Sequence, residues 1–166
     1  MKSALIKKIG LGLLVLLVLL QFFQPTKNQG EKYGSNDIYQ VTMTPTLVQT
    51  ALETSCFDCH SNSTVYPWYT KIQPIGLWMQ YHVNEGKEEL NFSEFKTYTP
   101  KRQAHKLDEI LEMIEEDEMP LASYTLIHKN AVLTEEQKVQ ILDWAKASAE
   151  EIRTKANLPE PSADAH

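Results

Sequence analysis

The longest apolar stretch of the chain lies at its N-terminus. The run from Ile9 to Phe23 is interrupted by only two glycines and one glutamine, and Lys7 and Lys8 precede it. A basic segment followed by a long apolar region is typical of an export signal or a membrane anchor. Residues 4–23 reach the roughly 20 residues that span a bilayer if the two lysines extend towards the interface. Because these lysines flank the N-terminal side, we expect that end in the cytoplasm and the rest of the chain outside.

This segment is compatible with a cleaved signal peptide or with an uncleaved anchor. Cleavage favours small residues in an A-x-A-like arrangement, whereas the run ends in the sequence QFFQPT at residues 21–26. No cysteine follows the run directly, so lipoprotein processing is not indicated either. We therefore predict an uncleaved, single-pass anchor over residues 1–24 in the bacterial inner membrane, with a domain in the periplasm.

Beyond the apolar run, the pattern predicts a tether, a domain and a tail. Residues 25–44 are polar, contain two glycines and show no sustained period, so we expect a flexible tether. The domain is expected over residues 45–155. Residues 156–166 contain Pro159 and Pro161 and are expected to be disordered.

Apolar residues at helical spacing predict four helices in this domain. Their expected ranges are 46–53, 74–86, 100–117 and a last helix that begins after Thr134. Thr99 followed by Pro100 is a favourable start for the third helix, and Thr134 with Gln137 forms a capping-box sequence at the fourth. Gly86 is expected to end the second helix. The predicted fold class is therefore all-α.

Length and charge narrow the class of protein. A chain of 166 residues is long enough for one domain with a hydrophobic core and short for two. Residues 1–24 contain three of the 16 basic residues and none of the 22 acidic ones, which leaves 13 basic and 22 acidic residues, or −9, for the remainder. An acidic domain is a poor candidate for nucleic-acid binding, which depends on basic side chains at phosphates.

The strongest chemical signal is the sequence Cys56-Phe57-Asp58-Cys59-His60, a C-x-x-C-H motif. This spacing is that of c-type haem attachment. Two thiols three positions apart form thioethers with the two vinyl groups of haem, and the histidine that follows is placed to bind the iron. Export and a c-type haem support each other, because covalent haem is attached on the outer side of the cytoplasmic membrane.

Three other interpretations of the motif remain open at this point. A zinc site needs about four ligands, and the chain has only two cysteines. A thioredoxin-like dithiol is expected beside a βαβ pattern, which the sequence does not show. In an oxidising compartment, two cysteines without haem form an ordinary disulfide, and this is the simplest alternative to one covalent haem c.

The second axial position of the iron decides between electron transfer and ligand binding. The candidate ligands are Met43, Met79, Met113, Met119, His82, His105 and His128. Met119 differs from the other methionines because Pro120 prevents helix continuation and leaves Met119 on a loop. We therefore predict that His60 and Met119 bind the iron. His82, His128 and an open site are the alternatives.

Two further features have competing interpretations. Tyr66, Trp68 and Tyr69 surround a proline and are expected either to pack on a porphyrin face or to belong to an ordinary core. The acidic run from Glu115 to Glu118 is either a docking patch for a basic redox partner or a solvated helix end. Acidic residues at a helix C-terminus are unfavourable with the helix dipole.

Taken together, several stretches resemble a bacterial haem-binding domain family of small membrane-anchored c-type haem proteins. They are the C-x-x-C-H motif, Tyr66-Pro67-Trp68-Tyr69, Asn91-Phe92-Ser93, and Glu118-Met119-Pro120-Leu121 with Tyr124. The resemblance covers roughly residues 45–150, and its plan is similar to that of class I cytochromes c.

This resemblance implies a helical domain around one haem c. It implies that Cys56 and Cys59 bind the haem covalently, that His60 is the proximal ligand and that Met119 is the distal one. Class I cytochromes c usually pair a glycine on the first helix with an aromatic residue on the last. Trp144 can supply the aromatic residue, but residues 46–53 contain no glycine, so the helix crossing is expected to differ.

The function that these features predict is one-electron transfer by a membrane-anchored periplasmic haem protein. Its partner would be an unidentified redox protein, with no nucleic acid and no small-molecule substrate. The alternative is a haem-based sensor with an open or displaceable sixth site. Peroxidase-like catalysis is not favoured, because the sequence shows no distal histidine and arginine pair.

Overall fold

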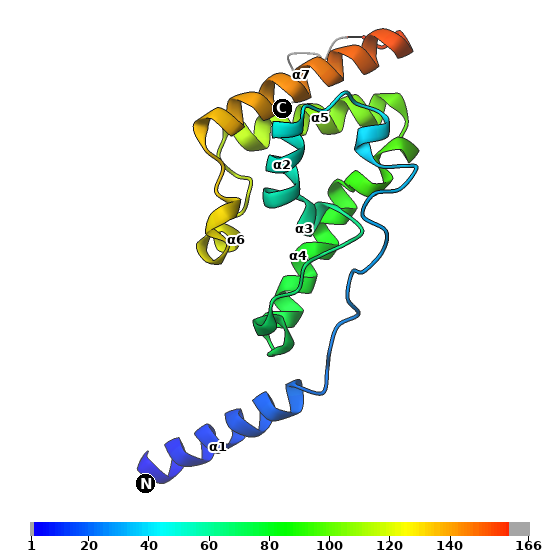
Figure 1. The fold of residues 1–166 in the computed structure, drawn as a ribbon. Coiled ribbons are helices and arrows are strands. Elements are labelled where there is room, and N and C mark those ends of the chain that lie inside the picture. The colour runs from blue at the N-terminus through cyan, green and yellow to red at the C-terminus, as the bar shows by residue number, and fades with distance from the viewer. Residues whose placement is uncertain (1, 160–166) are drawn as a thin grey trace.

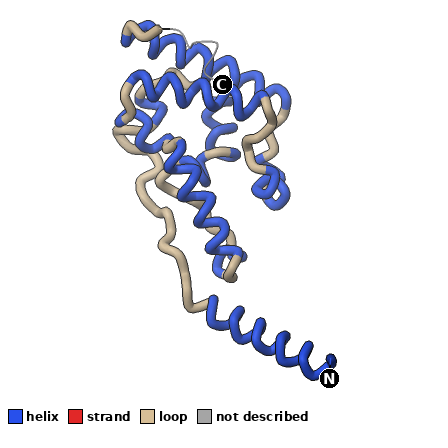
Figure 2. The backbone as a smooth tube through the Cα atoms, turned by 180° about the vertical axis from the view of Figure 1, so that it is seen from behind, coloured by secondary structure: helices blue, strands red, loops and turns tan. Residues whose placement is uncertain are grey.

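The structure is a computed structural model that describes residues 2–159, and every named element in that range is a helix (Figure 2). The α-helices are α1 Lys2–Leu20, α2 Thr46–Ser55, α3 Phe57–His60, α4 Ile75–Glu89, α5 Pro100–Glu115, α6 Ala122–Ile127 and α7 Glu135–Ala156. Short 3-10 helices are η1 Ile38–Gln40, η2 Trp68–Lys71, η3 Phe92–Thr97 and η4 Lys129–Ala131. The predicted all-α class is confirmed. Residues 160–166 of the expected tail lie outside the described residues.

The core lies where α2 meets the antiparallel pair α5 and α7 (Figure 1). Two local signals start this pair as expected. The Thr99 side chain accepts a hydrogen bond from the Arg102 amide, with Pro100 at the first helical position. Thr134 and Gln137 exchange hydrogen bonds with each other's backbone and form the capping box. The largest fully buried apolar side chains are Phe57, Phe92, Phe95, Ile38, Leu52, Leu107, Ile141, Val48 and Val83.

The segment 25–44 contacts the domain instead of forming a free tether. The Gly30 amide donates to the Asn62 carbonyl at 2.6 Å, and the Asn28 side chain donates to the Ser61 carbonyl at 2.8 Å. Ile38 has no exposed surface and belongs to the core cluster. One apolar anchor among polar turn residues gives no periodic signal, so the sequence pattern resembled that of a linker.

Helix α4 also differs from its expected extent. It continues through Gly86 and ends at Glu89, three residues later than predicted. A glycine near the end of an apolar period is normally a stop signal. Here its lack of a side chain serves a close contact with α3, which is described below.

Helix α1 projects away from the domain, and its residues are exposed along its length (Figure 1). It is long and apolar enough to cross a membrane, a property that export signals share. Its end, however, is not separated from the domain, since Gln21 and Gln24 hydrogen bond to residues 71 and 73.

If residues 25–44 are part of the folded unit, Ile38→Ala should destabilise the domain strongly. We expect a loss of about 2–5 kcal/mol in the free energy of unfolding, because the substitution leaves a cavity in a closed core. Denaturant unfolding of the full chain in detergent, followed by the near-ultraviolet circular dichroism of the aromatic residues, measures this loss. Met43→Ala is the matched control from the same segment, since Met43 is 87% exposed, and it should change stability by less than about 0.5 kcal/mol. Equal small effects of both substitutions would show that the segment is a tether after all.

Candidate functional site

The C-x-x-C-H motif forms the junction between α2 and α3. The Cys56 amide closes the last turn of α2 on the Leu52 carbonyl at 2.8 Å, and α3 begins at the next residue. Phe57 points into the core and stacks on Phe92, with ring centroids 5.0 Å apart. Phe57 therefore anchors the motif to the core, and Cys56 and Cys59 are partly buried and form no disulfide.

Burial raises the pKa of the Cys56 thiol to about 12 and that of the Cys59 thiol to about 11. Both thiols are therefore protonated at neutral pH. Reactive dithiols show the opposite shift. Among the described residues, the structure also shows no cluster of three or more His, Cys, Asp and Glu side chains that could hold a metal ion. The dithiol and zinc interpretations of the motif thus gain no support.

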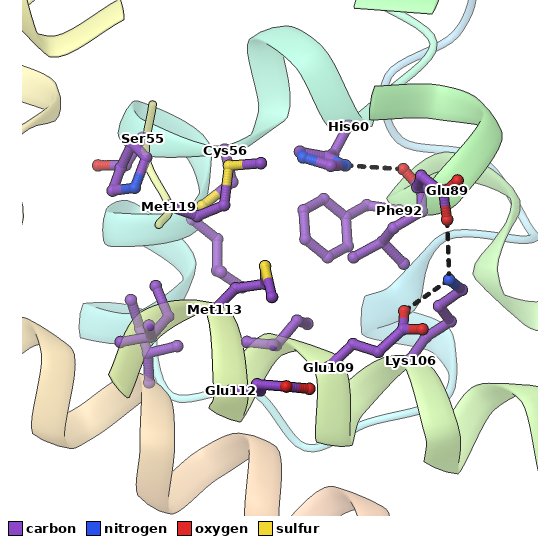
Figure 3. A pocket seen from close by; sticks show the side chains of 16 residues that line it. Ser55, Cys56, His60, Glu89, Phe92, Lys106, Glu109, Glu112, Met113 and Met119 are labelled. Atoms are coloured by element: carbon purple, nitrogen blue, oxygen red, sulfur yellow. Dashed lines mark hydrogen bonds and ion pairs between the residues drawn. The ribbon is translucent and has the colours of Figure 1, made fainter. Parts of the chain in front are cut away.

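His60 is held by its ring nitrogen Nδ1, which lies 3.0 Å from the Leu90 carbonyl oxygen (Figure 3). A carbonyl only accepts, so Nδ1 carries the hydrogen and donates it, which leaves the lone pair on Nε2. Burial lowers the pKa of His60, so the ring is neutral. A histidine ligand whose second nitrogen donates to a backbone carbonyl has its tautomer and ring orientation fixed.

Two adjoining cavities open on either side of this junction, with volumes of about 380 and 410 Å³. Six residues line both cavities: Ser55, Cys56, His60, Glu89, Met119 and Pro120. We refer to the two cavities together as the motif cleft. The first cavity has mainly apolar walls from α2, η3 and α5, including Leu52, Phe92 and Ile110. The second cavity is bordered by α4 and α6.

One edge of the first cavity is charged (Figure 3). The buried Lys106 ammonium pairs with Glu89 at 3.3 Å and with Glu109 at 2.5 Å. A largely apolar cleft with a few converging polar groups is the usual form of a cofactor site.

The structure separates the candidate second ligands into two groups. Met119 lines both cavities, Met113 lines the first and His82 lines the second. In the described part of the chain, Met43, Met79, His105 and His128 line neither cavity. His128 is engaged elsewhere, since its Nε2 lies 3.1 Å from the Tyr69 hydroxyl and its Nδ1 lies 3.1 Å from the Tyr124 carbonyl.

Met119 reaches the cleft because α5 ends in a Schellman motif. Asp117 adopts the left-handed conformation with φ 59°, and the Glu118 amide donates to the Met113 carbonyl at 3.0 Å. The Met119 amide donates to the same carbonyl at 3.1 Å. The chain thus turns back on the last turn of α5. Asp117 also pairs with Lys138, so part of the acidic run has a structural role.

A second connection links the far side of this loop to the motif. The Tyr124 hydroxyl on α6 donates to Asp58 Oδ2 at 2.8 Å, and Asp58 Oδ1 accepts from the Val65 amide at 3.1 Å. Asp58 stands between the two cysteines, and burial together with this carboxylate raises the pKa of Tyr124. Sequence analysis missed this pair, because contacts between residues 66 positions apart leave no local pattern.

Tyr66, Trp68 and Tyr69, which were considered for packing on a porphyrin, do not line the cleft. Tyr66 accepts a hydrogen bond from the Asn28 amide and donates to Gln80, Trp68 is 74% exposed, and Tyr69 contacts His128. Phe92 instead supplies an aromatic ring to the cleft wall, 6.0 Å from the ring of His60.

The motif and α4 approach each other at Gly86. A Cβ atom on Gly86 would lie 2.9 Å from the Cys59 carbonyl oxygen and 3.1 Å from the Cys59 Cβ. The nearest obstacle is backbone, which does not move aside as a side chain tip does. The glycine therefore allows α4 to cross α3 directly behind the second cysteine.

Comparison with known proteins adds one finding. A family model described as a haem-binding domain matches residues 15–147. No curated protein and no solved structure matches the chain. The matched range contains the C-x-x-C-H motif, α4 and the Met119 loop.

The Gly86 contact predicts the direction of the stability change caused by replacing this glycine with alanine. In an ordinary helix position Gly→Ala stabilises by about 1 kcal/mol, whereas Gly86→Ala should destabilise by about 1–3 kcal/mol because of overpacking against backbone. It should also lower the amount of haem recovered with the protein. Gly34→Ala is the control, since its nearest neighbour is the flexible Glu31 side chain at 3.4 Å. Thermal unfolding and haem content measure both variants, and a stabilised Gly86→Ala protein with full haem content would refute the contact.

Proposed function

The chain belongs to the haem-binding domain family, and on this premise we propose that it is a membrane-anchored c-type haem protein that carries single electrons in the periplasm. The observation that carries the proposal is the fixed neutral His60, whose Nε2 keeps its lone pair, in a cleft that Cys56 and Met119 also line. When bound, a haem supplies an iron that alternates between the ferric and ferrous states.

The residues of the cleft fit such a group. Cys56 and Cys59 would hold it covalently, since each S–H adds across one vinyl double bond to give a thioether and no oxidant is needed. The His60 imidazole would bind the iron through Nε2, while Leu90 keeps the hydrogen on Nδ1. Apolar walls from Leu52, Phe92 and Ile110 would exclude water.

Met119 is our proposed second ligand. Among the described residues it is the one methionine that lines both cavities, and its soft, neutral thioether favours ferrous iron and therefore a comparatively high potential. Met113 on α5 lines the first cavity only. With both axial positions filled by the protein, the chain would exchange electrons without binding a substrate.

The setting of the domain supports this role. We propose that α1 anchors the protein in the inner membrane, with its lysines on the cytoplasmic side and the domain in the periplasm. The domain is strongly acidic, which favours a basic redox partner that electrostatic attraction steers towards it.

One observation favours a second candidate, a haem-based sensor with a displaceable sixth ligand. Every residue of α6, which follows the Met119 loop, is at least partly exposed. Little burial holds this loop in place, so an exogenous diatomic ligand would meet a small barrier to displacing Met119. Rapid binding of carbon monoxide to the reduced wild-type protein would identify the sensor, and absence of binding would identify the carrier.

Covalent attachment can be tested directly. Haem should remain with the polypeptide after denaturation and acidic organic extraction of the wild-type protein. Cys56→Ser and Cys59→Ser should each leave a single thioether, and the double variant should release all haem. Met119→Ala is the control that keeps both thioethers. Extraction of haem from the wild-type protein would rule out the c-type assignment.

The second ligand is tested by comparing Met119→Ala with Met113→Ala. We expect Met119→Ala to lose the long-wavelength methionine–iron charge-transfer band of the ferric protein. Its reduction potential should fall by on the order of 100 mV, because the thioether that favours ferrous iron is gone. Met113→Ala, which removes a thioether from the same cleft, should keep the band. Visible spectra and redox titration provide both readouts, and loss of the band in Met113→Ala alone would move the ligand to α5.

A further inference from the structure

The end of α1 is attached to one end of the domain by side-chain amides. Gln73 and Gln21 form a reciprocal pair, in which the Gln73 amide donates to Gln21 Oε1 at 3.0 Å and Gln21 Nε2 donates to the Gln73 carbonyl at 3.1 Å. Gln73 Nε2 donates to Gln24 Oε1 at 3.1 Å, and Gln24 Nε2 donates to the Lys71 carbonyl at 3.3 Å. The segment between η2 and α4 is thus held beside the end of the apolar helix (Figures 1 and 2).

The same end of the domain exposes large apolar side chains. We call this group the apolar tip: Trp68, Ile72, Ile75 and Trp78, which are between 43% and 74% exposed. Phe22 and Phe23 at the end of α1 are 79% and 67% exposed. A concentration of exposed apolar residues is unusual for a surface that faces only water.

The outward face of α4 changes character along its length. Gly76, Gln80 and Val83 form its buried side. The opposite side carries apolar and aromatic residues in the first two turns and glutamates from Glu85 onward. In Figure 1 the start of α4 lies near the end of α1, and its later turns lie near α3. Such a gradient matches the passage from acyl chains through headgroups to water.

The tip also differs from the rest of the domain in its charge. Residues 21–30 and 61–84, which pair with each other from the tip up to Asn62, contain none of the 22 acidic residues of the chain. They contribute Lys27 and Lys71 on the domain side. An acid-free surface with lysines suits the anionic headgroups of a bacterial membrane, whereas the acidic remainder of the domain is repelled by them.

From these observations we propose that the apolar tip lies in the headgroup layer of the bilayer that holds α1. Trp68 and Trp78 are residues of the type that concentrates at membrane interfaces, where an amphipathic ring has one apolar and one hydrated side. This inference rests on the membrane anchoring put forward above. It adds a second attachment, through the surface of the domain itself, and it fixes the orientation of the domain.

The orientation sets the height of the haem motif. Gly86, which contacts Cys59, comes eleven residues after Ile75 on α4. At a rise of 1.5 Å per residue this places the motif roughly 16 Å along the helix from the tip. The cleft is thus carried above the headgroups at a constant distance, within reach of partners bound to the same membrane.

The three tryptophans provide the test, since two belong to the tip and the third, Trp144, is buried in the core. The full-length protein with its haem is reconstituted into vesicles of phosphatidylethanolamine and anionic phosphatidylglycerol. Matched vesicles contain the same lipids brominated on the acyl chains next to the headgroup. Bromine quenches tryptophan emission at contact, and comparison of one variant in both vesicles cancels the loss of emission to haem.

Trp144→Phe, which keeps the tip tryptophans, should lose most of its emission in the brominated vesicles. The double variant Trp68→Phe/Trp78→Phe, which keeps Trp144, should lose little. Exposed tryptophans are replaced in this second variant, so its folding is not at issue. Equal quenching of the two variants, or an unquenched Trp144→Phe protein, would overturn the proposal. An unquenched protein that crosslinks through the tip would assign the tip to contacts between copies of this chain.

Other failures are distinguishable from this one. Protein that does not float with the vesicles would disprove anchoring and, with it, the position of the tip. Protein that floats and is quenched but lacks covalent haem would overturn the proposed function and leave the membrane contact intact.

Discussion

The close contact between the end of α4 and α3 is the constraint on which the site depends. Gly86 admits the backbone of Cys59, and Leu90, the residue that follows α4, receives the hydrogen bond from His60. Both interactions involve one short stretch at the end of α4. The position of Cys59 and the tautomer of His60 are therefore set together. A side chain at position 86 would shift α3 away, lengthen the bond to Leu90 and release the imidazole. The orientation of the His60 imidazole is therefore determined by helix packing rather than by a dedicated polar side chain.

Sequence analysis predicted the parts of this arrangement that have local causes. The starts of α5 and α7 follow from Thr99, Pro100 and the Thr134 capping box, and the all-α class follows from the helical period. The motif stood out because two cysteines and a histidine at this fixed spacing are typical of c-type haem attachment. Met119 was selected because Pro120 ends helical structure, and the structure places it on the cleft.

The other features of the site and the fold depend on contacts between residues far apart in the sequence, which produce no local sequence pattern. The Leu90 carbonyl has no side-chain signature, since any residue offers the same acceptor. A glycine near the end of a helix can either terminate it or allow another backbone to approach closely. We predicted that Gly86 ends α4, and this prediction was wrong. Ile38 is one apolar residue among polar neighbours, so its burial could not be inferred without the surface that receives it. The acidic run at the end of α5 has a partly structural role, because Asp117 adopts the left-handed conformation that ends the helix and pairs with Lys138. Neither feature can be inferred from the run itself.

The choice between electron carrier and sensor depends on how firmly the Met119 loop is held. On one side of Met119, the Schellman motif fixes the chain to the end of α5 through backbone hydrogen bonds. On the other side, Tyr124 binds Asp58, and its partly buried hydrogen bond to a carboxylate is worth about 1.5–3 kcal/mol. The apolar burial that usually holds a loop is small, because the whole of α6 is at least partly exposed. The Tyr124–Asp58 bond joins this loop to a residue between the two cysteines, so one contact positions both the Met119 loop and the motif. Under the proposed function, a haem held by Cys56 and Cys59 would keep Asp58 in place and, through Tyr124, would reduce the freedom of Met119 to leave the iron, which favours the carrier.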